Sequence, residues 1–345
     1  MLAVRSLLAP SLRSFANAAS TGRQILTRKD VDFVVNPDEK YMDEFMKYHG
    51  NDRGVFKKAD ISMWQKCFGK EYTFKLMCLK GTTRVISCSQ SCVFKPLDAS
   101  NEPTIFIGLG WIEPEVRKMR VAALLSDMLS ENVLSAESNI TSNVNSDLKR
   151  FWYTLCDKKD TDTSGNEAMN IGYKSFYDYK DVVIPKNISF DGITVKSVKD
   201  VPKMDMISYD HKIHPYHREE YLIAHMNDKD GFGKVAYDEK GKVIGIAQAV
   251  IYPAGDCNLG PMYGDNPRAV QAMFAEILKD IAASGKTITK FEVRSIDESA
   301  TWIKPFLKCE LTKEVVCSLL YNKWKPKNID FSKVYAPTHA QLFLV

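Results

Sequence analysis

The stretch from Pro103 to Glu131 constrains the fold more than any other part of the chain. Its first part, 104–107, is a short apolar run of β-prone residues that ends at Gly108. Its last part predicts a helix, because apolar residues recur on one helical face: Val121, Leu124, Leu125, Met128 and Leu129. The basic segment 117–122 lies between them, and the free N–H groups and dipole of a helix start favour an anion. The stretch therefore predicts a strand, a loop that could hold an anion, and a helix. The alternative is a buried strand followed by an ordinary surface helix.

The segments around this stretch predict the order β–α–α–β–β–β–α. Before it, the patterns predict a strand at 32–35, helices at 39–48 and 60–68, and a hairpin formed by 72–79 and 84–94. After it, the polar, Ser- and Asn-rich segment 131–147 predicts a surface connection, and 151–156 predicts a buried strand.

The second half of the chain repeats this order about 150 residues later. Segment 187–192 is the best candidate for a linker, and strands are expected at 193–198, 233–237 and 243–252. A helix follows with Asn266 as its N-cap, Pro267 at its first position and Gly285 after its end. Further strands are expected at 287–293, 311–320 and 340–345, with a short helix at 298–307. We therefore predict an α/β fold with mixed sheets and two domains, 30–187 and 188–345.

The opening stretch resembles the phosphate-binding motif of the GCN5-related N-acetyltransferases (GNAT). The residues that match this motif in order are Ile112, Pro114, Glu115, Arg117, Val121, Ala122, Leu124 and Leu125. Arg120 departs from it, because the family has a glycine there that lets the backbone approach the coenzyme A pyrophosphate. The side chain of Arg120 could block the phosphate site or contact phosphate. The resemblance implies two tandem GNAT domains and acetyl-CoA, or another acyl-CoA, as co-substrate, bound by Ile112, Arg117, Lys118, Met119, Arg120, Val121 and Ala122.

The resemblance also suggests catalytic residues in the first domain. The final helix of the family carries a tyrosine near the thioester sulfur, and Tyr173 is at the matching position as a candidate general acid, although the Gly-Phe pair of the family is absent. A tyrosine packed between helix and sheet is the alternative. Glu113, at the end of the predicted strand, is a candidate base for the acceptor amine, with a solvated loop carboxylate as the alternative.

The second half resembles the acetyltransferase-like domain of YitH/HolE-type proteins. Its sharpest match is the segment 260–265, GPMYGD, and Asp210 and Arg218 match a second motif of that domain. This resemblance implies a pocket at Gly260, Tyr263, Gly264 and Arg218, in which the two glycines would leave the backbone open to a ligand.

Composition describes an ordinary globular protein, with 45% hydrophobic and 26% charged residues. The net charge of +4 is mild and gives no reason to expect nucleic acid as a partner. No apolar run reaches the roughly 18 residues that span a membrane. Cys88 and Cys92 are expected on one sheet face as small buried residues. The histidines at 211, 214 and 217 are expected to be exposed loop residues rather than metal ligands.

Residues 1–29 have the composition of a mitochondrial transit peptide. They contain five basic residues, several serines and no acidic residue, and their apolar residues at 8, 12 and 15 share a helical face. We therefore expect a location in the mitochondrial matrix.

The sequence is compatible with two functions. The first is an acyl-CoA-dependent N-acyltransferase that acts on an amine of a small molecule or a protein. The second is a catalytically silent tandem module that binds coenzyme A or a protein partner. The sequence indicates neither the acceptor nor the oligomeric state.

Overall fold

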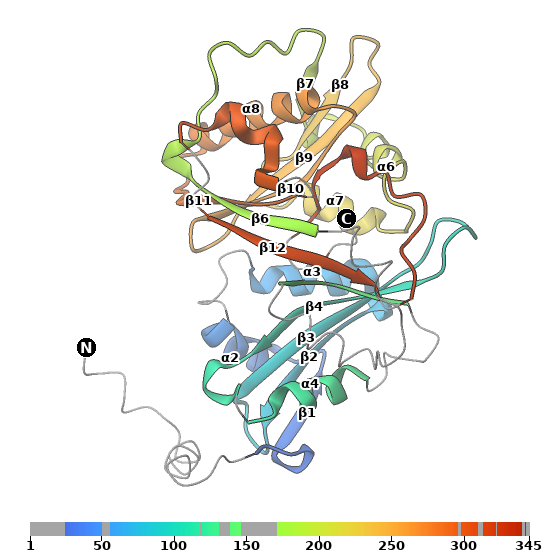
Figure 1. Cartoon of the computed structure of the whole chain (residues 1–345), viewed down its shortest axis with the longest axis vertical. Coiled ribbons are helices and arrows are strands. Elements are labelled where there is room, and N and C mark those ends of the chain that lie inside the picture. Colours follow the sequence, from blue (N-terminus) through green and yellow to red (C-terminus); the bar gives the residue numbers. More distant parts are fainter. Residues whose placement is uncertain are drawn as a thin grey trace.

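The computed structural model describes residues 25–49, 56–117, 119–130, 139–145, 171–295, 298–309, 313–321, 323–339 and 342. Within these residues one sheet of 13 strands runs through the molecule, in the order β1-β2-β3-β4-β5-β12-β6-β11-β10-β9-β8-β7, with β13 paired to β10 (Figure 1). The strands are β1 (Val31–Val35), β2 (Tyr72–Leu79), β3 (Val85–Phe94), β4 (Thr104–Ile112), β5 (Asn139–Asn145), β6 (Ile171–Asp178), β7 (Thr194–Ser197), β8 (Lys234–Tyr237), β9 (Val243–Ile251), β10 (Asp256–Gly264), β11 (Lys290–Ser295), β12 (Lys313–Tyr321) and β13 (Val334–Ala336). The α-helices are α2 (Glu39–His49), α3 (Lys58–Phe68), α4 (Val121–Ser130), α6 (Lys203–Asp210), α7 (Glu219–Met226) and α8 (Pro267–Ser284).

The first half of the molecule places helices on both faces of an antiparallel sheet, β1 to β4. Helices α2 and α3 pack on one face through Phe45 and Trp64, and both side chains are buried. Helix α4 packs on the opposite face through the apolar stripe that predicted it, including Val121 and Met128. Every strand and helix predicted between residues 32 and 129 is present, although β4 extends beyond Gly108 to Ile112.

The second half repeats this arrangement. Helices α6 and α7 cover one face of β7 to β10, and α8 covers the other. The predicted N-cap of α8 is confirmed, because Asn266 Oδ1 accepts a hydrogen bond from the N–H of Ala269 at 3.0 Å. Gly285 ends the helix in the left-handed conformation, with φ at 66°, as the sequence predicts.

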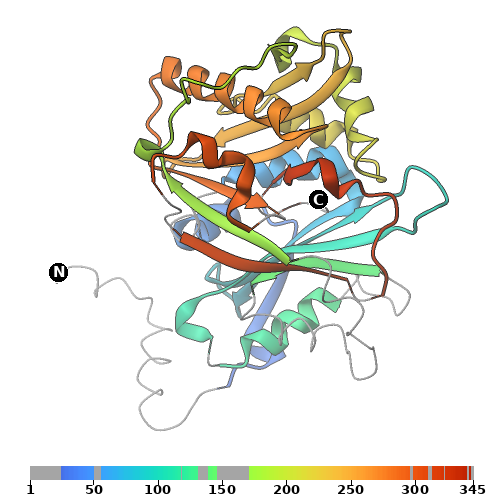
Figure 2. The same cartoon turned by 45° about the horizontal axis from the view of Figure 1, so that its top comes forward.

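The two halves exchange strands where they meet. β5 follows α4 and runs parallel to β4, and β11 follows α8 and runs parallel to β10. The next strand of each half then pairs in the other half: β12 pairs with β5, and β6 pairs with β11. β6 and β12 also pair with each other, which makes the sheet continuous (Figures 1 and 2). Each half is therefore completed by a strand from the other half.

Four predictions about secondary structure need correction or fall outside the described residues. The predicted surface connection at 131–147 is wrong for 139–145, which form β5. Its Asn139 is buried and bonded rather than solvated, since Nδ2 donates to Thr104 Oγ1 and to the carbonyl of Trp324, each at 3.0 Å. The predicted helix around Tyr173 is also wrong, because Tyr173 lies on β6. The predicted strand at 151–156 lies outside the described residues, as does most of the one at 340–345, and a late strand is found instead at β13.

Candidate functional site

The candidate site begins where β4 and β5 diverge. The two parallel strands pair only from Thr104 to Phe106, after which β5 continues beside β12. On its other side, β4 stays paired with β3 as far as Ile112, across a bulge where Leu109 has a φ of 51°. The carbonyl of Leu109 accepts a hydrogen bond from the Cys88 thiol at 3.1 Å. The second half of β4 is thus held from one side by β3 while its neighbour on the other side turns away.

A short basic turn leads from the end of β4 into α4. One 3-10 turn, η3 (Pro114–Val116), follows Glu113 and is closed by the N–H of Val116, which donates to the carbonyl of Glu113 at 3.0 Å; the N–H of Met119 then donates to the carbonyl of Val116 at 2.9 Å. Arg117 is exposed, and its Nε donates to the carbonyl of Ile112 at 3.1 Å. Lys118 lies outside the described residues. The carbonyl of Arg120 accepts the first helical hydrogen bond of α4, from Ala123 at 3.0 Å.

The backbone of Arg120 adopts a conformation that favours glycine, which is the residue that the GNAT motif has at this position. Its φ is 62°, in the left-handed region that glycine enters without cost and that a residue with a Cβ enters at about 1–2 kcal/mol. The backbone of the turn therefore keeps the glycine-like path although the residue is an arginine. The side chain is exposed. Arginine has no hydrogen-bond acceptor, so it cannot cap the N–H groups of Val121 and Ala122 at the start of α4.

Glu113 is not the solvated loop carboxylate that was the alternative at the sequence level. It is 5% exposed, and one of its carboxylate oxygens forms an ion pair with Arg84. Its N–H donates to the carbonyl of Ile86 at 2.9 Å, which joins the strand end to β3. Burial raises the pKa of Glu113, and the positive charge of Arg84 opposes this rise. The other carboxylate oxygen, Oε2, is buried and has no hydrogen-bond partner within the part of the chain that the structure describes.

Tyr173 is not brought beside this turn. It lies on β6, where it is partly buried and pairs with Val316 of β12 and Ser295 of β11. In the sheet, β5 and β12 lie between β4 and β6. Its role as a general acid therefore stays a prediction from the resemblance alone.

The residues predicted for a second-half pocket come together in a packed interior. Gly260 does not leave open backbone, because a Cβ there would lie 2.0 Å from the carbonyl oxygen of Pro337. At Gly264 a Cβ would lie 2.7 Å from a methyl group of Val270. Tyr263 is fully buried. The expectation of ligand space at these glycines is therefore wrong, since the chain itself fills that space.

Arg218, the fourth of these residues, belongs to a buried ion pair. Its guanidinium donates to both carboxylate oxygens of Asp210, at 2.7 and 3.0 Å, and to the hydroxyl oxygens of Thr338 and Tyr263, at 2.9 and 3.2 Å. It thus links α6, the start of α7, β10 and the segment after β13.

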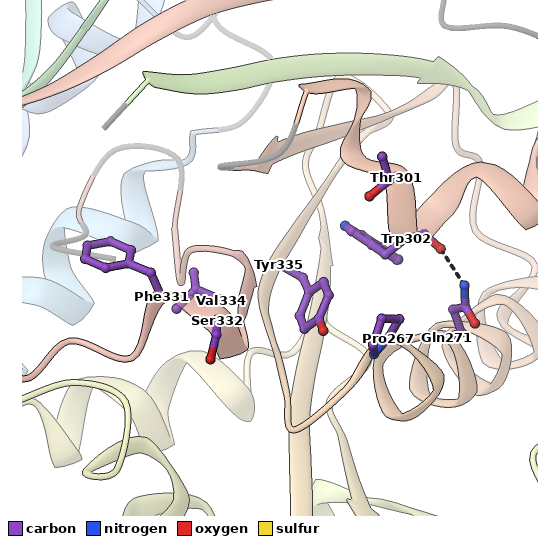
Figure 3. Close-up of a pocket in the computed structure, with 8 residues that line it drawn as sticks. All are labelled: Pro267, Gln271, Thr301, Trp302, Phe331, Ser332, Val334 and Tyr335. Carbon is purple, nitrogen blue, oxygen red and sulfur yellow. Dashed lines mark hydrogen bonds between the residues drawn. The ribbon is translucent and has the colours of Figure 1, made fainter. Parts of the chain in front are cut away.

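A pocket of about 330 Å³ does lie in the second half, beside the start of α8 (Figure 3). The side chain of Gln271 reaches across one end of it and donates to the carbonyl of Trp302 at 2.9 Å, and Val334 and Tyr335 of β13 lie on another side. None of Gly260, Tyr263, Gly264 and Arg218 lines it. Its lining residues carry no formal charge: Pro267, Gln271, Thr301, Trp302, Phe331, Ser332, Val334 and Tyr335.

The prediction for the two cysteines is confirmed, and the prediction for the three histidines is wrong in part. Cys88 and Cys92 are buried in the same apolar cluster, as predicted. Of the three histidines expected to be exposed, His217 is exposed, His211 is partly buried and His214 is fully buried, so the prediction is wrong for His214. Burial lowers the pKa of His214 well below its ordinary value.

Among the described residues, no group of three His, Cys, Asp or Glu side chains is placed to hold a metal ion. No helix in the part of the chain that the structure describes could cross a membrane.

Sequence patterns missed a buried polar cluster between the halves. Asp60 of α3 is 2% exposed, and one of its oxygens accepts the N–H of Lys57 at 2.9 Å. From the second half, His339 places its Nε2 3.8 Å from Asp60 and 2.7 Å from the hydroxyl of Tyr252. The ammonium of Lys57 forms an ion pair with Asp228 at 2.7 Å. The signal that could have suggested this cluster is a lone aspartate on an otherwise apolar helix face.

The fold is that of a tandem GNAT protein, and three solved structures share it. A putative acetyltransferase from Pyrococcus horikoshii has 13% identity and a TM-score of 0.56, over 92% of this chain and 97% of its own. A tandem GNAT protein from the clavulanic acid biosynthesis pathway has 10% identity and a TM-score of 0.55, over 86% and 100%. The N-myristoyltransferase of Saccharomyces cerevisiae with bound myristoyl-CoA has 10% identity and a TM-score of 0.57, over 92% and 87%. The predicted fold of two tandem GNAT units is confirmed.

The chain belongs to the family described as "Protein of unknown function (DUF1248)", whose model matches residues 28–213. No curated protein matches the chain.

Proposed function

We propose that the protein is an acyl-CoA-dependent N-acyltransferase, which transfers an acyl group, acetyl in the simplest case, to an amine of a small molecule or a protein. The observation that carries the proposal is the divergence of β4 from β5 directly before a basic turn and a helix start whose preceding residue, Arg120, has no side-chain acceptor. The arm of coenzyme A contains two amide groups, which can pair with a strand edge as an added peptide strand does. Its phosphates suit the start of α4, with Arg117 and Arg120 beside it.

In this mechanism the chain mainly binds and orients the two substrates. The amine nitrogen attacks the thioester carbonyl, the C–S bond breaks, the amine loses a proton, and the thiolate leaves and takes up a proton. Positioning alone can supply much of the rate enhancement for such a transfer. Glu113 is the candidate base near the end of β4, because burial raises its pKa towards the range useful for proton transfer. Its ion pair with Arg84 would have to loosen for it to accept a proton.

That same ion pair favours the second candidate function, a module that binds coenzyme A or a protein partner without catalysis. Arg84 occupies one carboxylate oxygen of Glu113 and opposes the rise of its pKa, and Tyr173 lies on a strand that β5 and β12 separate from β4. Binding and turnover separate the two functions. Calorimetric titration of the full chain with acetyl-CoA is expected to show binding by the enzyme and by a module that binds coenzyme A, and release of free thiol with a panel of amines is expected only from the enzyme. If the chain bound neither acetyl-CoA nor coenzyme A, both the enzyme and the coenzyme A-binding module would be ruled out. Only a role in binding a protein partner would then remain.

We also propose a location in the mitochondrial matrix, on the composition of residues 1–29. The packing of Leu26 limits where a transit peptide could be cleaved from the chain. Its side chain is 3% exposed in the core under α4, and its N–H donates to the carbonyl of Met119 at 3.1 Å. Processing that keeps this packing would occur before residue 25 rather than after 29. Import of a fluorescent fusion of residues 1–30 into mitochondria tests the location, with the arginines at 5, 13 and 23 replaced by glutamine as the control.

A further inference from the structure

The second half contains the same divergence of strands as the first, but another strand fills it. β10 pairs in parallel with β11 only from Asp256 to Leu259. Beyond a register shift, the same edge of β10 pairs with β13 in antiparallel orientation, Met262 with Ala336 and Tyr263 with Val334. β13 therefore lies where β11 leaves β10, which is the position at which β5 leaves β4 in the first half.

β13 is built into the second half rather than laid on its surface. Val334 is 4% exposed and packs in the cluster under α6 and α7, and Ala336 is fully buried in the cluster under α8. Its side chains thus enter the cores on both faces of the sheet. The carbonyl of Pro337 approaches Gly260 so closely that only a residue without a Cβ fits there. An extended ligand could replace this strand only if both cores opened.

The helix starts of the two halves also differ in what they offer to an anion. At α8, Asn266 already satisfies the N–H of Ala269, and Pro267 has no N–H. At α4, the preceding Arg120 has no acceptor with which to cap the N–H groups of Val121 and Ala122. The start of α8 therefore lacks most of the donors that a phosphate group would use.

The residues that follow β13 connect the second half to the first half. Thr338 Oγ1 accepts a hydrogen bond from Arg218 at 2.9 Å, and the ring of His339 lies 5.1 Å from that of Trp64 of the first half, edge to face. Leu342 is fully buried in the cluster under α2 and α3. β13 thus anchors a segment that reaches from the second half into the core of the first.

We propose that the chain holds one acyl-CoA, in the first half, and that β13 permanently occupies the matching position of the second half and anchors residues 337–339, which contact the first half. This inference rests on the proposed function, and it assigns the binding site that the proposed function requires. The pocket beside α8 is consistent with it, because β13 forms part of its wall and its lining carries no charge for a phosphate.

Calorimetric titration of the full chain with acetyl-CoA and with free coenzyme A tests the inference. We expect a stoichiometry of one for each. Two exposed arginines near the helix starts give a pair of variants: Arg120→Glu directly before α4, and Arg268→Glu at the second residue of α8, where the side chain donates to the carbonyls of Ser189 and Asp191 at 3.3 Å. Arg120→Glu should weaken binding by about tenfold or more, because it replaces an attractive charge beside the phosphates by a repulsive one. Arg268→Glu should leave the affinity within about twofold, which is under about 0.5 kcal/mol.

Two results would overturn the inference and leave the proposed function intact. One is a stoichiometry of two, and the other is loss of binding by Arg268→Glu with Arg120→Glu unaffected. An unmodified chain that binds neither ligand would instead overturn the proposed function and this inference with it. Circular dichroism of each variant before titration identifies any loss of folding. If Arg120→Glu were misfolded, Arg117→Gln would take its place, with the same expected loss of affinity.

Discussion

Arg218 and Asp210 form a bidentate ion pair whose two side chains are each 1% exposed. The guanidinium joins the residue before α7 to the last residue of α6, and Thr338 extends the network to the segment after β13. Burying two charges this deeply costs much desolvation energy, so the pair adds little net stability. Loss of either partner, however, would leave the other charge buried without compensation. The pair therefore fixes one arrangement of the second half and of residues 337–339, where His339 contacts Trp64 of the first half.

Asp210→Asn should destabilise the protein strongly. The change leaves the Arg218 charge buried without its counter-charge, for which the usual cost is about 3–5 kcal/mol. Urea unfolding followed by circular dichroism measures it. Glu44→Gln removes one partner of the exposed Lys47–Glu44 pair on α2 and should cost less than about 1 kcal/mol. Equal effects of the two changes would show that the Arg218–Asp210 pair does not hold the second half together.

The contribution of Asp60 to the free energy of unfolding should fall as pH rises, the reverse of what an ion-paired aspartate gives. Burial raises its pKa to about 7, whereas an unfolded aspartate titrates near 3.9. The folded state therefore binds more protons than the unfolded state between these values, and the contribution of Asp60 to stability falls as pH rises from about 4 to about 7. Lys57, Asp228, Tyr252 and His339 face this carboxyl group.

Asp60→Asn isolates this contribution. The buried His339 has a lowered pKa, and its effect has the opposite sign, but it is present in both proteins and cancels in the difference. The variant should gain stability relative to the unmodified protein as pH rises through this window, and the difference should level off above about pH 7. Thermal unfolding from pH 4 to 8 measures it, and a difference that does not change with pH would contradict a raised pKa.

Arg120→Gly should weaken the binding of acetyl-CoA with little effect on stability. Its backbone already follows the left-handed path of a glycine, so the side chain is not needed to form the turn and does not distort it. Relief of this conformation and the greater freedom of glycine in the unfolded chain should nearly offset each other, within about 1 kcal/mol. Calorimetric titration decides the role of the side chain. Lower affinity identifies a phosphate ligand, and higher affinity would show that Arg120 blocks the site.

The exchange of β6 and β12 should prevent either half from folding alone. Segment 30–187 lacks both neighbours of its β6, and segment 188–345 lacks β5 and β6, the two neighbours of its β12. Each segment expressed alone should be insoluble or give a poorly dispersed amide NMR spectrum, and co-expression should recover a soluble complex. A well-dispersed spectrum from either segment alone would show that the halves are independent domains.

The sequence predicted the elements whose signals are local. Helices α4 and α8 have apolar stripes over whole turns, and α8 also has a capping asparagine and a terminal glycine, so both were placed correctly. β5 was missed because its buried Asn139 is satisfied by partners that are distant in sequence, which no local pattern shows. β13 has three residues, too few for a periodic signal.

The candidate site could be predicted only in part. The resemblance identified the turn before α4 and singled out Arg120, but the effect of an arginine there depends on its φ, which the sequence does not give. The glycines at 260 and 264 suggested open space, and the structure shows that Pro337 and Val270 take that space. Strand exchange was not predictable, because local patterning determines that a segment is a strand but not which strand lies beside it.

Hydrogen–deuterium exchange of the full chain with and without acetyl-CoA tests the central claim most directly. If acyl-CoA binds between the diverging strands of the first half, amides in 107–112 and 119–123 should exchange more slowly in its presence. Amides in 260–264 and 266–270 should be unchanged, because β13 already pairs with β10. Protection confined to 260–270, or saturating binding without protection in 107–123, would contradict the account.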